Sequence, residues 1–558
     1  MNHYHNGGDL LVETLRRFGV DTVFGVVSVH NLPLVEAVDR DLRFVPVRHE
    51  ASAVSAADGY GRARGGLGCA LTSTGTGAGN AAGALVESLT AGSSVLHITG
   101  QIESEHLGSG RGVIHETKDQ LGMLRAVSRH AVTVTEAANA GAILDEAATL
   151  ALAAPGGPVS IEWPIDLQYE AQALGGSPAP TTSVAPPRPD PVALRAAAEL
   201  LAGARRPLVW AGGGASRAGS ELAALLEELN AGLLTSNAGR GAVPEDHWRC
   251  VGNFATAPAG RALLDEADVL LTIGTHLRSN ETADYSLRLP EAHIQIDIDA
   301  AALGRVHPAT HALHGDAAGT LTTLITLLHR TTGRTATDPG WADRIRNART
   351  DARSTLHEQI GPQAAICDAI RSALPRRAVI ARDVTIPSSS WGNRLLDIYD
   401  PRDNVFPLGG GIGQGLGMGI GAALARPDAP TVVMAGDGGL AVHLGELLTL
   451  AQEKPRLTLI VFNDGGYGVL RNMQERYFDR RSGVDLATPD FELLARAVGL
   501  PFARITGGVQ AAATISKAVA ADGPVLVEVD LTELGPMKTP FTPPVKLPVR
   551  ITAGISAQ

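Results

Sequence analysis

The sequence predicts an α/β protein made of three doubly wound parallel sheets, each in its own domain. Two observations lead to this prediction. Short apolar, β-branched runs alternate with helical segments along most of the chain, which is the pattern of parallel strands joined by crossover helices. A length of 558 residues is also too great for a single core. We place the domains at residues 1–174, 190–332 and 350–540.

Composition describes an ordinary globular chain and excludes several classes of function. Apolar residues make up 44% and charged residues 19% of the chain. A net charge of −11 offers no basic surface for nucleic acid. No apolar run is long enough to span a membrane, and the N-terminus does not resemble a signal peptide. The three scattered cysteines, Cys69, Cys250 and Cys367, fit a reducing compartment, so we expect a cytoplasmic protein.

The N-terminal third alternates helix and strand from Gly8 onward. The pattern predicts helices around residues 10–18 and 32–38, and strands at 23–27 and 44–47. The second strand leads into Arg48-His49-Glu50 and an Ala-rich helix. A Glu that opens a helix is often there only because the helix dipole favours it.

A Gly-rich stretch at residues 72–80 follows and predicts a turn into another helix. Such a turn could hold a phosphate, although glycine-rich turns are common. Two histidines, His30 and His115, lie in predicted loops of this third. Each is either an ordinary surface histidine or a group that moves protons near neutral pH.

The middle third begins after a linker at 175–191, which contains six prolines. A helix is predicted at 192–204 and strands at 206–211, 267–275 and 294–299. The first of these strands ends on Gly212-Gly213-Gly214, which is too incomplete to indicate a dinucleotide site. A second linker at 331–340 leads to the last domain.

The C-terminal third contains the pattern that bears most on function. A predicted strand at 431–435 ends on Gly436-Asp437-Gly438, and another at 457–462 ends on Asn463-Asp464. Ligands of open α/β sheets bind at the carboxyl ends of strands, and Mg²⁺ prefers such oxygen ligands. Asp-Gly is by itself only a turn dipeptide, so the spacing between the two motifs decides whether they indicate a binding site.

This spacing, strand–GDG–helix–strand–Asn-Asp, resembles the thiamine diphosphate (ThDP) binding motif. The residues Arg48-His49-Glu50 and Gly59-Tyr60-Gly61-Arg62 resemble the pyrimidine-binding domain of the ThDP decarboxylase and acetolactate synthase superfamily. Residues 72–80 resemble its TSGPGATN loop, and the likeness continues along the whole chain. It implies a pyrimidine-binding domain, a central Rossmann-like domain and a diphosphate-binding domain, in that order.

The resemblance also assigns roles to individual residues. Glu50 would contact N1′ of the aminopyrimidine, and Ile412 would hold the cofactor in its bent shape. Asp437, Asp464 and the Gly466 carbonyl would bind Mg²⁺. The full set of implied cofactor contacts is Glu50, Thr74, Gly75, Asn80, Ser388, Ser389, Gly411, Ile412, Gly436, Gly438, Gly439, Tyr467, Gly468 and Val469.

The same resemblance implies a ThDP- and Mg²⁺-dependent carboligase that decarboxylates a 2-keto acid and joins the acyl unit to a second carbonyl. His30, His115 and Glu116 are candidate catalytic residues beside Glu50. Met473 stands where acetolactate synthases carry a tryptophan, and His115-Glu116 replaces Phe-Gln, so branched-chain amino-acid synthesis is less favoured. The alternatives are a 2-keto acid decarboxylase, a benzaldehyde-lyase-like C–C lyase, or a catalytically silent paralogue.

Family resemblance further implies a homodimer or homotetramer with active sites at the dimer interface. The substrates would be small 2-keto acids or aldehydes, and neither nucleic acid nor membrane is expected as a partner. Some relatives hold FAD in the central domain, but we favour an empty one here.

Overall fold

The computed structural model describes residues 5–172, 174, 186–478 and 480–543. The chain divides into two compact units. The first contains Met1–Pro187, Arg240–Asp246 and Arg353–Pro540, and the second contains Arg188–Gly239 and His247–Ala352 together with the C-terminal residues. Within the described ranges, no helix is long and apolar enough to cross a membrane.

The N-terminal sheet of the first unit has six parallel strands in the order β2-β1-β3-β4-β6-β5. Its strands are β1 (Thr22–Gly25), β2 (Arg43–Pro46), β3 (Gly68–Thr72), β4 (Val95–Gln101), β5 (His130–Thr133) and β6 (Val159–Pro164). Its helices are α1 (Gly7–Arg17), α2 (Leu32–Asp41), α3 (Glu50–Arg64), α4 (Thr76–Ala91), α5 (Gln120–Val127), α6 (Ala140–Leu152) and α7 (Ile165–Tyr169). Apolar residues such as Leu11, Leu96 and Trp163 fill the space between sheet and helices.

The C-terminal sheet of the same unit repeats this topology in the order β14-β13-β15-β16-β18-β17. Its strands are β13 (Val379–Arg382), β14 (Asn404–Val405), β15 (Thr431–Gly436), β16 (Leu457–Asn463), β17 (Phe502–Ile505) and β18 (Val525–Asp530). Its helices are α13 (Ala364–Ala373), α14 (Gly415–Ala425), α15 (Asp437–Leu440), α16 (Glu446–Glu453), α17 (Gly468–Tyr477), α18 (Phe491–Val498), α19 (Gly508–Val519) and α20 (Leu531–Leu534).

The second unit holds the third parallel sheet, in the order β12-β11-β10-β7-β8-β9. Its strands are β7 (Pro207–Ala211), β8 (Gly232–Thr235), β9 (Cys250–Gly252), β10 (Val269–Ile273), β11 (His293–Asp297) and β12 (His311–His314). Its helices are α8 (Pro191–Ala202), α9 (Gly219–Leu229), α10 (Pro258–Glu266) and α11 (Ala317–Arg330), followed by α12 (Trp341–Gln359), whose residues belong to both units. Three doubly wound parallel sheets are therefore present, as predicted.

Several predicted strands end earlier than expected; those predicted at 44–47 and 267–275 end at Pro46 and Ile273. At two other strands, side chains bind the backbone groups that would continue the sheet. The strand predicted at 23–27 ends at Gly25, since the Asn31 amide donates to the Val26 carbonyl at 3.0 Å. The strand predicted at 294–299 ends at Asp297, whose carboxylate accepts the Asp299 N–H at 2.9 Å. The linker predicted at 175–191 lies outside the described residues for positions 175–185. The predicted domain boundaries stay predictions.

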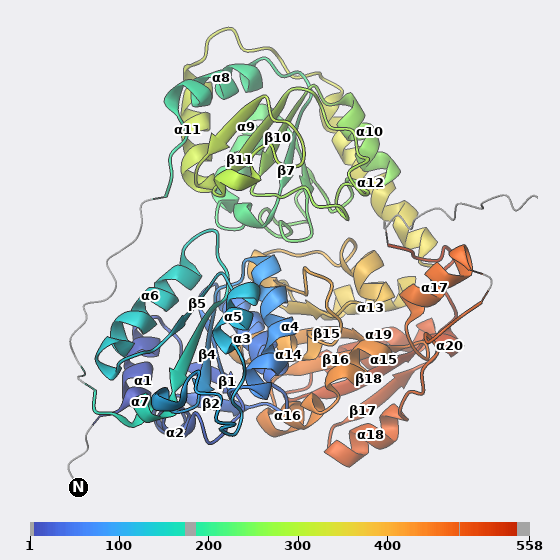
Figure 1. The fold of residues 1–558 in the computed structure, drawn as a ribbon. Helices are drawn as coiled ribbons and strands as arrows, with labels where there is room; N and C mark the ends of the chain where they lie inside the picture. Colours follow the sequence, from blue (N-terminus) through green and yellow to red (C-terminus); the bar gives the residue numbers. More distant parts are fainter. Residues whose placement is uncertain (1–4, 173, 175–185, 479, 544–558) are drawn as a thin grey trace, which may run out of the picture. The chain divides into compact units, whose positions relative to one another are not determined.

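Helices α3 and α14 join the two sheets of the first unit and lie side by side (Figure 1). Both are rich in glycine and alanine, which lets their backbones approach closely. A Cβ on Gly59 would lie 2.0 Å from the Met418 carbonyl oxygen, and one on Gly421 would lie 1.9 Å from the Ala56 carbonyl oxygen. Close backbone contact between α3 and α14 thus fixes the position of one sheet relative to the other.

The topology of each sheet in the first unit creates one crevice for a ligand. The chain leaves β1 towards β2 on one side, while β3 pairs with β1 on the other. The same reversal occurs between β13 and β15. Open α/β sheets bind ligands at such switch points, at the carboxyl ends of the strands. These ends carry most of the residues that the sequence singles out.

Candidate functional site

The carboxyl end of β15 carries Asp437, which begins the short helix α15. The residue is 2% exposed, and burial raises the pKa of its carboxyl group. Its Oδ1 accepts the Asp464 N–H at 3.4 Å, whereas its buried Oδ2 has no hydrogen-bond partner within the part of the chain that the structure describes. A buried oxygen without a donor is costly, and a bound cation would satisfy it.

Asp464 lies beside Asp437 at the carboxyl end of β16. Burial, and then the neighbouring charge of Asp437, raise the pKa of Asp464 to about 6. Arg471 offsets part of this negative charge, with Nη1 3.8 Å from Asp464 Oδ2, and it also donates to the Asp464 carbonyl at 3.1 Å. A Cβ on Gly468 would lie only 2.0 Å from Asp464 Oδ2. The aspartate can adopt this position because residue 468 has no side chain.

The third predicted metal ligand, the Gly466 carbonyl, lies in the same place. A Cβ on Gly438 would be 3.1 Å from the Gly466 oxygen and 2.9 Å from the Tyr467 ring. Among the described residues, no three His, Cys, Asp or Glu side chains gather as a metal site. The arrangement here instead consists of two carboxylates and one backbone carbonyl, which is a donor set that suits Mg²⁺.

Ser388 and Ser389 follow β13, the strand next to β15. They lie in a single π-helical turn, η6 (Ser388–Gly392). The Ser388 hydroxyl is buried and has no partner among the described residues, while the Ser390 hydroxyl donates to the Ile386 carbonyl at 2.6 Å. The Ser388 hydroxyl is therefore available for a diphosphate at this edge.

Glu50 opens α3 on the N-terminal sheet, and its carboxylate is only partly buried. Its Oε2 accepts from Asn80 Nδ2 at 3.0 Å. The Gly75 N–H and the Thr74 hydroxyl both bond to Gln120 Oε1, at 2.7 and 2.9 Å, which fixes the turn before α4. The structure thus pairs Glu50 with Asn80, and it shows that Gln120, which the sequence reasoning missed, holds the predicted cofactor contacts Thr74 and Gly75.

The residues before Glu50 bind the other half of the same unit. The Arg48 N–H donates to Glu446 Oε1 at 3.0 Å, and the rings of His49 and His443 lie 4.9 Å apart. The start of α3, which Glu50 opens, is therefore tied to α16 and the segment before it in the C-terminal half.

His30 and His115 meet beside the turn of residues 74–76. Their Nδ1 atoms lie 3.5 Å apart, and the rings meet edge to face. His30 is 4% exposed; burial, and then the charge of His115, lower the pKa of His30, and Glu103 partly offsets this. His115 has a φ of 68°, an uncommon value for a residue other than glycine, and such backbone values concentrate at functional sites.

Glu116 binds the backbone of its own loop. Its carboxylate accepts the N–H groups of Gly110, Gly112 and Val113, at 3.1, 2.9 and 3.2 Å. These bonds hold the loop that presents His115. The catalytic role expected of Glu116 stays a prediction, and the contacts favour a supporting role.

Ile412 lies on an irregular turn between β14 and α14, and its side chain is 39% exposed. Two buried carboxylates hold this turn. Asp383 accepts the N–H groups of Gly413 and Gly415 at 3.0 and 3.1 Å, and burial raises the pKa of Asp383 to about 6. Glu87 accepts the Gly409 N–H. Sequence reasoning missed both residues, although Asp383 follows a strand end as Asp437 does.

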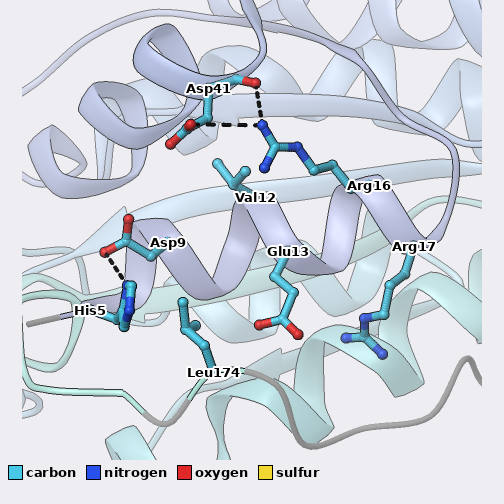
Figure 2. A pocket seen from close by; sticks show the side chains of 8 residues that line it. All are labelled: His5, Asp9, Val12, Glu13, Arg16, Arg17, Asp41 and Leu174. Atoms are coloured by element: carbon cyan, nitrogen blue, oxygen red, sulfur yellow. Dashed lines mark hydrogen bonds and ion pairs between the residues drawn. The ribbon is translucent and has the colours of Figure 1, made fainter.

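A surface groove runs along α1 (Figure 2). Charged side chains line most of it, and several pair with one another, as in the His5–Asp9 and Arg16–Asp41 contacts. None of the predicted site residues is among the described residues that line it: His5, Asp9, Val12, Glu13, Arg16, Arg17, Asp41 and Leu174. We assign no function to this groove.

Comparison with known proteins identifies the three sheets. Residues 5–123 match the N-terminal TPP binding domain of thiamine pyrophosphate (thiamine diphosphate) enzymes, residues 194–324 match their central domain, and residues 387–529 match their C-terminal TPP binding domain. These segments contain the Glu50, β7–β12 and Asp437 regions respectively.

Individual relatives extend over most of the chain. A probable 2-ketoarginine decarboxylase of Pseudomonas aeruginosa is 34% identical, covering 88% of this chain and 88% of that protein. A probable acetolactate synthase large subunit of Methanocaldococcus jannaschii is 28% identical over 96% of this chain and 93% of its own length. The acetolactate synthase isozyme 2 large subunit of Escherichia coli is 28% identical over 97% and 98%. The chain is a thiamine diphosphate-dependent enzyme and belongs to the family that contains these decarboxylases and acetolactate synthases.

Proposed function

We propose that this enzyme decarboxylates a 2-keto acid and releases the product after protonation. The observation that carries the proposal is the His30–His115 pair, with its Nδ1 atoms 3.5 Å apart beside the turn that follows β3. Two imidazoles in contact can pass a proton between them near neutral pH. Burial lowers the pKa of His30, which favours the neutral ring, and a neutral imidazole has one nitrogen that accepts a proton and one that donates.

Bound thiamine diphosphate supplies an electron sink for the charge that remains when CO₂ leaves a 2-keto acid. The chain's own residues surround this chemistry. Glu50, held by Asn80, would exchange a proton at the aminopyrimidine. His30 and His115 would deliver the proton that completes the product. Retention of Glu50, Asp437 and Asp464 argues against a catalytically silent paralogue.

A carboligase is the second candidate. Acetolactate synthase relatives match this chain over more than nine-tenths of its length. In a ligation, the reacting carbon bonds to a second carbonyl instead of taking up a proton. The outcome therefore depends on whether a proton from His30 or His115 reaches this carbon before the second carbonyl does. A benzaldehyde-lyase-like reaction would use the same histidines in the reverse direction.

We further propose that Asp437, Asp464 and the Gly466 carbonyl bind Mg²⁺ together with the cofactor diphosphate. The support is the buried Oδ2 of Asp437, which has no hydrogen-bond partner among the described residues and lies beside a second carboxylate. Ser388, whose buried hydroxyl also lacks a partner among the described residues, would contact the diphosphate, with Ser389 beside it.

We propose a homodimer, or a homotetramer built from such dimers, in which Glu50 of one chain completes the Asp437 site of another. Large apolar side chains next to the predicted site residues are exposed in the single chain. Val29 beside His30 is 60% exposed, and Ile114 beside His115 is 69% exposed. Ile412 itself and Leu470 are exposed in the same way, and a second copy would cover such a surface.

For the central domain we propose no FAD. The N–H groups of Gly212 and Gly214 donate to the Ile273 and Gly274 carbonyls, at 2.8 and 3.0 Å. They are therefore not available to a dinucleotide at this switch point. We also propose a cytoplasmic location, which the three buried free thiols support.

The deciding experiment is a product analysis by mass spectrometry with ThDP and Mg²⁺. The donors are pyruvate, 2-ketobutyrate and 2-ketoarginine, each alone and with an added aldehyde. CO₂ with free aldehyde supports the decarboxylase, whereas acetolactate or a mixed acyloin identifies the carboligase. A Glu50→Gln variant run in parallel must lose the product, because a silent scaffold would not need this carboxylate.

A further inference from the structure

Glu87 is a buried carboxylate that neither the sequence reasoning nor the proposed chemistry uses. It lies on α4 of the N-terminal sheet and is 3% exposed. Its Oε1 and Oε2 both accept the Gly409 N–H, at 2.7 and 2.9 Å. Burying a carboxylate costs free energy unless hydrogen bonds compensate for the lost water. The contact between Glu87 and the turn that carries Ile412 therefore needs a functional or structural explanation.

The turn from Gly409 to Gly415 is irregular and depends on side chains for its shape. Asp383 binds the N–H groups of Gly413 and Gly415 from the C-terminal sheet. Glu87 binds the Gly409 N–H from the N-terminal sheet. The two carboxylates therefore hold the turn at both ends, and Ile412 lies within it with 39% of its surface exposed.

Close packing shows that the Glu87 contact is specific. A Cβ on Gly409 would lie 2.8 Å from Glu87 Oε2 and 3.4 Å from the Thr90 methyl group. Any side chain at position 409 would therefore push the carboxylate away from the N–H group. Glycine at this position allows the turn to lie directly on α4.

Helix α4 also connects this turn to the predicted catalytic base. Asn80, which binds Glu50, and Glu87 lie seven residues apart on α4. This spacing is two helical turns, so both side chains lie on one face, about 10 Å apart along the axis. One helix thus binds the Glu50 carboxylate near one end and the Ile412 turn near the other; in the proposed dimer, this chain's Glu50 serves the cofactor site of another chain.

We propose that Glu87 is a positioning residue of the cofactor site, which fixes the Ile412 turn through Gly409 before the cofactor arrives. The proposal rests on the proposed role of Ile412 in shaping bound ThDP. It predicts that the loss of Glu87 loosens residues 409–413 in the apoprotein. It also predicts that C2 of the bound cofactor loses its proton more slowly, while the diphosphate of the cofactor remains bound at the Asp437 edge.

The test compares Glu87→Ala, Glu87→Gln and Gly409→Ala with wild type. Glu146→Ala is the control, because Glu146 is an exposed helical glutamate. Amide hydrogen exchange by mass spectrometry reports on residues 409–413 without cofactor. Calorimetry gives the affinity for ThDP with Mg²⁺. Hydrogen–deuterium exchange at C2 of the bound cofactor reports how fast C2 loses its proton.

We expect Glu87→Ala and Gly409→Ala to speed amide exchange in the turn. We also expect them to slow C2 exchange roughly tenfold, the effect of losing one charge-assisted hydrogen bond. Glu87→Gln keeps an acceptor oxygen and should recover most of the C2 exchange. In an Ile412→Ala background, the loss of Glu87 should add little, because both changes act on the same turn.

Wild-type amide and C2 exchange in Glu87→Ala would overturn the proposal, as would losses that add fully to those of Ile412→Ala. If Glu87→Ala does not fold, Gly409→Ala gives the same test from the other side of the contact. A further outcome is that Ile412→Ala leaves C2 exchange unchanged while Glu87→Ala still speeds amide exchange in the turn of the apoprotein. In that case the role assigned to Ile412 is wrong, whereas Glu87 does hold the turn in place.

Discussion

The Nδ1 atoms of His30 and His115 lie 3.5 Å apart, although the two residues are 85 positions apart in the chain. His30 follows β1, and His115 lies on the loop before α5. The contact exists because both segments end at the same edge of the sheet, where the Asn31 side chain and the turn before α4 fix their backbones. It places two imidazole rings in contact where the sequence showed only two separate loops.

The first prediction concerns this pair. His30→Ala should lower turnover about 100-fold, because it removes a positioned proton donor, and leave ThDP affinity unchanged. The double variant with His115→Ala should be little worse than the poorer single variant, since the rings act as a unit. Steady-state kinetics and calorimetry measure both effects. The exposed His130 supplies the control His130→Ala, and fully multiplicative losses would show that the histidines act independently.

The second prediction concerns the metal edge. Asp437→Ala should weaken Mg²⁺-dependent ThDP binding by about 100-fold or more, because even outer-shell partners of a metal are worth 10–100-fold. Calorimetry with and without Mg²⁺ separates the metal-dependent part. Asp522→Ala, which changes an exposed aspartate, should behave as wild type. An unchanged affinity in the Asp437 variant would contradict the metal assignment.

The third prediction uses the packing of a glycine. In Gly468→Ala the new methyl group would be placed 2.0 Å from Asp464 Oδ2, so the carboxylate must move. We expect weaker Mg²⁺ dependence and a loss of about 1–3 kcal/mol in stability from overpacking. The matched control is Gly523→Ala, because a Cβ at Gly523 meets nothing within 4 Å. Equal behaviour of the two variants would mean that Asp464 is not held as described.

The fourth prediction concerns pH and His97. This residue is buried within the N-terminal sheet, between the Thr72 and Ser160 hydroxyls at 2.9 and 3.0 Å. Burial lowers the pKa of His97 from 6.5 to about 3. Between these values the unfolded chain binds a proton that the folded chain does not. Stability should therefore fall as the pH falls below 6.5, by about 1.4 kcal/mol per pH unit from this group.

His97→Gln removes that titration while it keeps polar atoms near both hydroxyls. The melting temperature of the variant, measured from pH 7 to pH 5, should fall less steeply than that of wild type. Only the difference in slope is diagnostic, because other groups titrate in the same range. Parallel curves would show that His97 does not contribute to the acid sensitivity.

Much of the site could be predicted from local patterns. The alternation of apolar strands and helices indicated parallel sheets, and strand ends at Asp437 and Asp464 indicated an oxygen-rich edge. Such predictions succeed because a strand's burial and its terminal turn are encoded within a few neighbouring residues. The family resemblance then supplied the cofactor.

Other contacts could not be predicted, because they join residues that are distant in sequence. Glu87 and Gly409 are 322 positions apart. Gln120, which fixes Gly75, is an ordinary helix residue until the sheet places it beside the turn. Glu116 illustrates the opposite case, since its position suggested catalysis while its three backbone hydrogen bonds favour support of a loop.

The sequence by itself therefore determined the three parallel sheets, the cofactor family and the residues at the strand ends, because these depend on periodicity and local motifs. Only the tertiary structure decided that His30 meets His115, and that Asp437 keeps a buried oxygen with no hydrogen-bond partner in the described part of the chain. It alone placed two carboxylates around the Ile412 turn. These features depend on how backbones separated by tens to hundreds of residues pack against one another, and no local pattern carries that information.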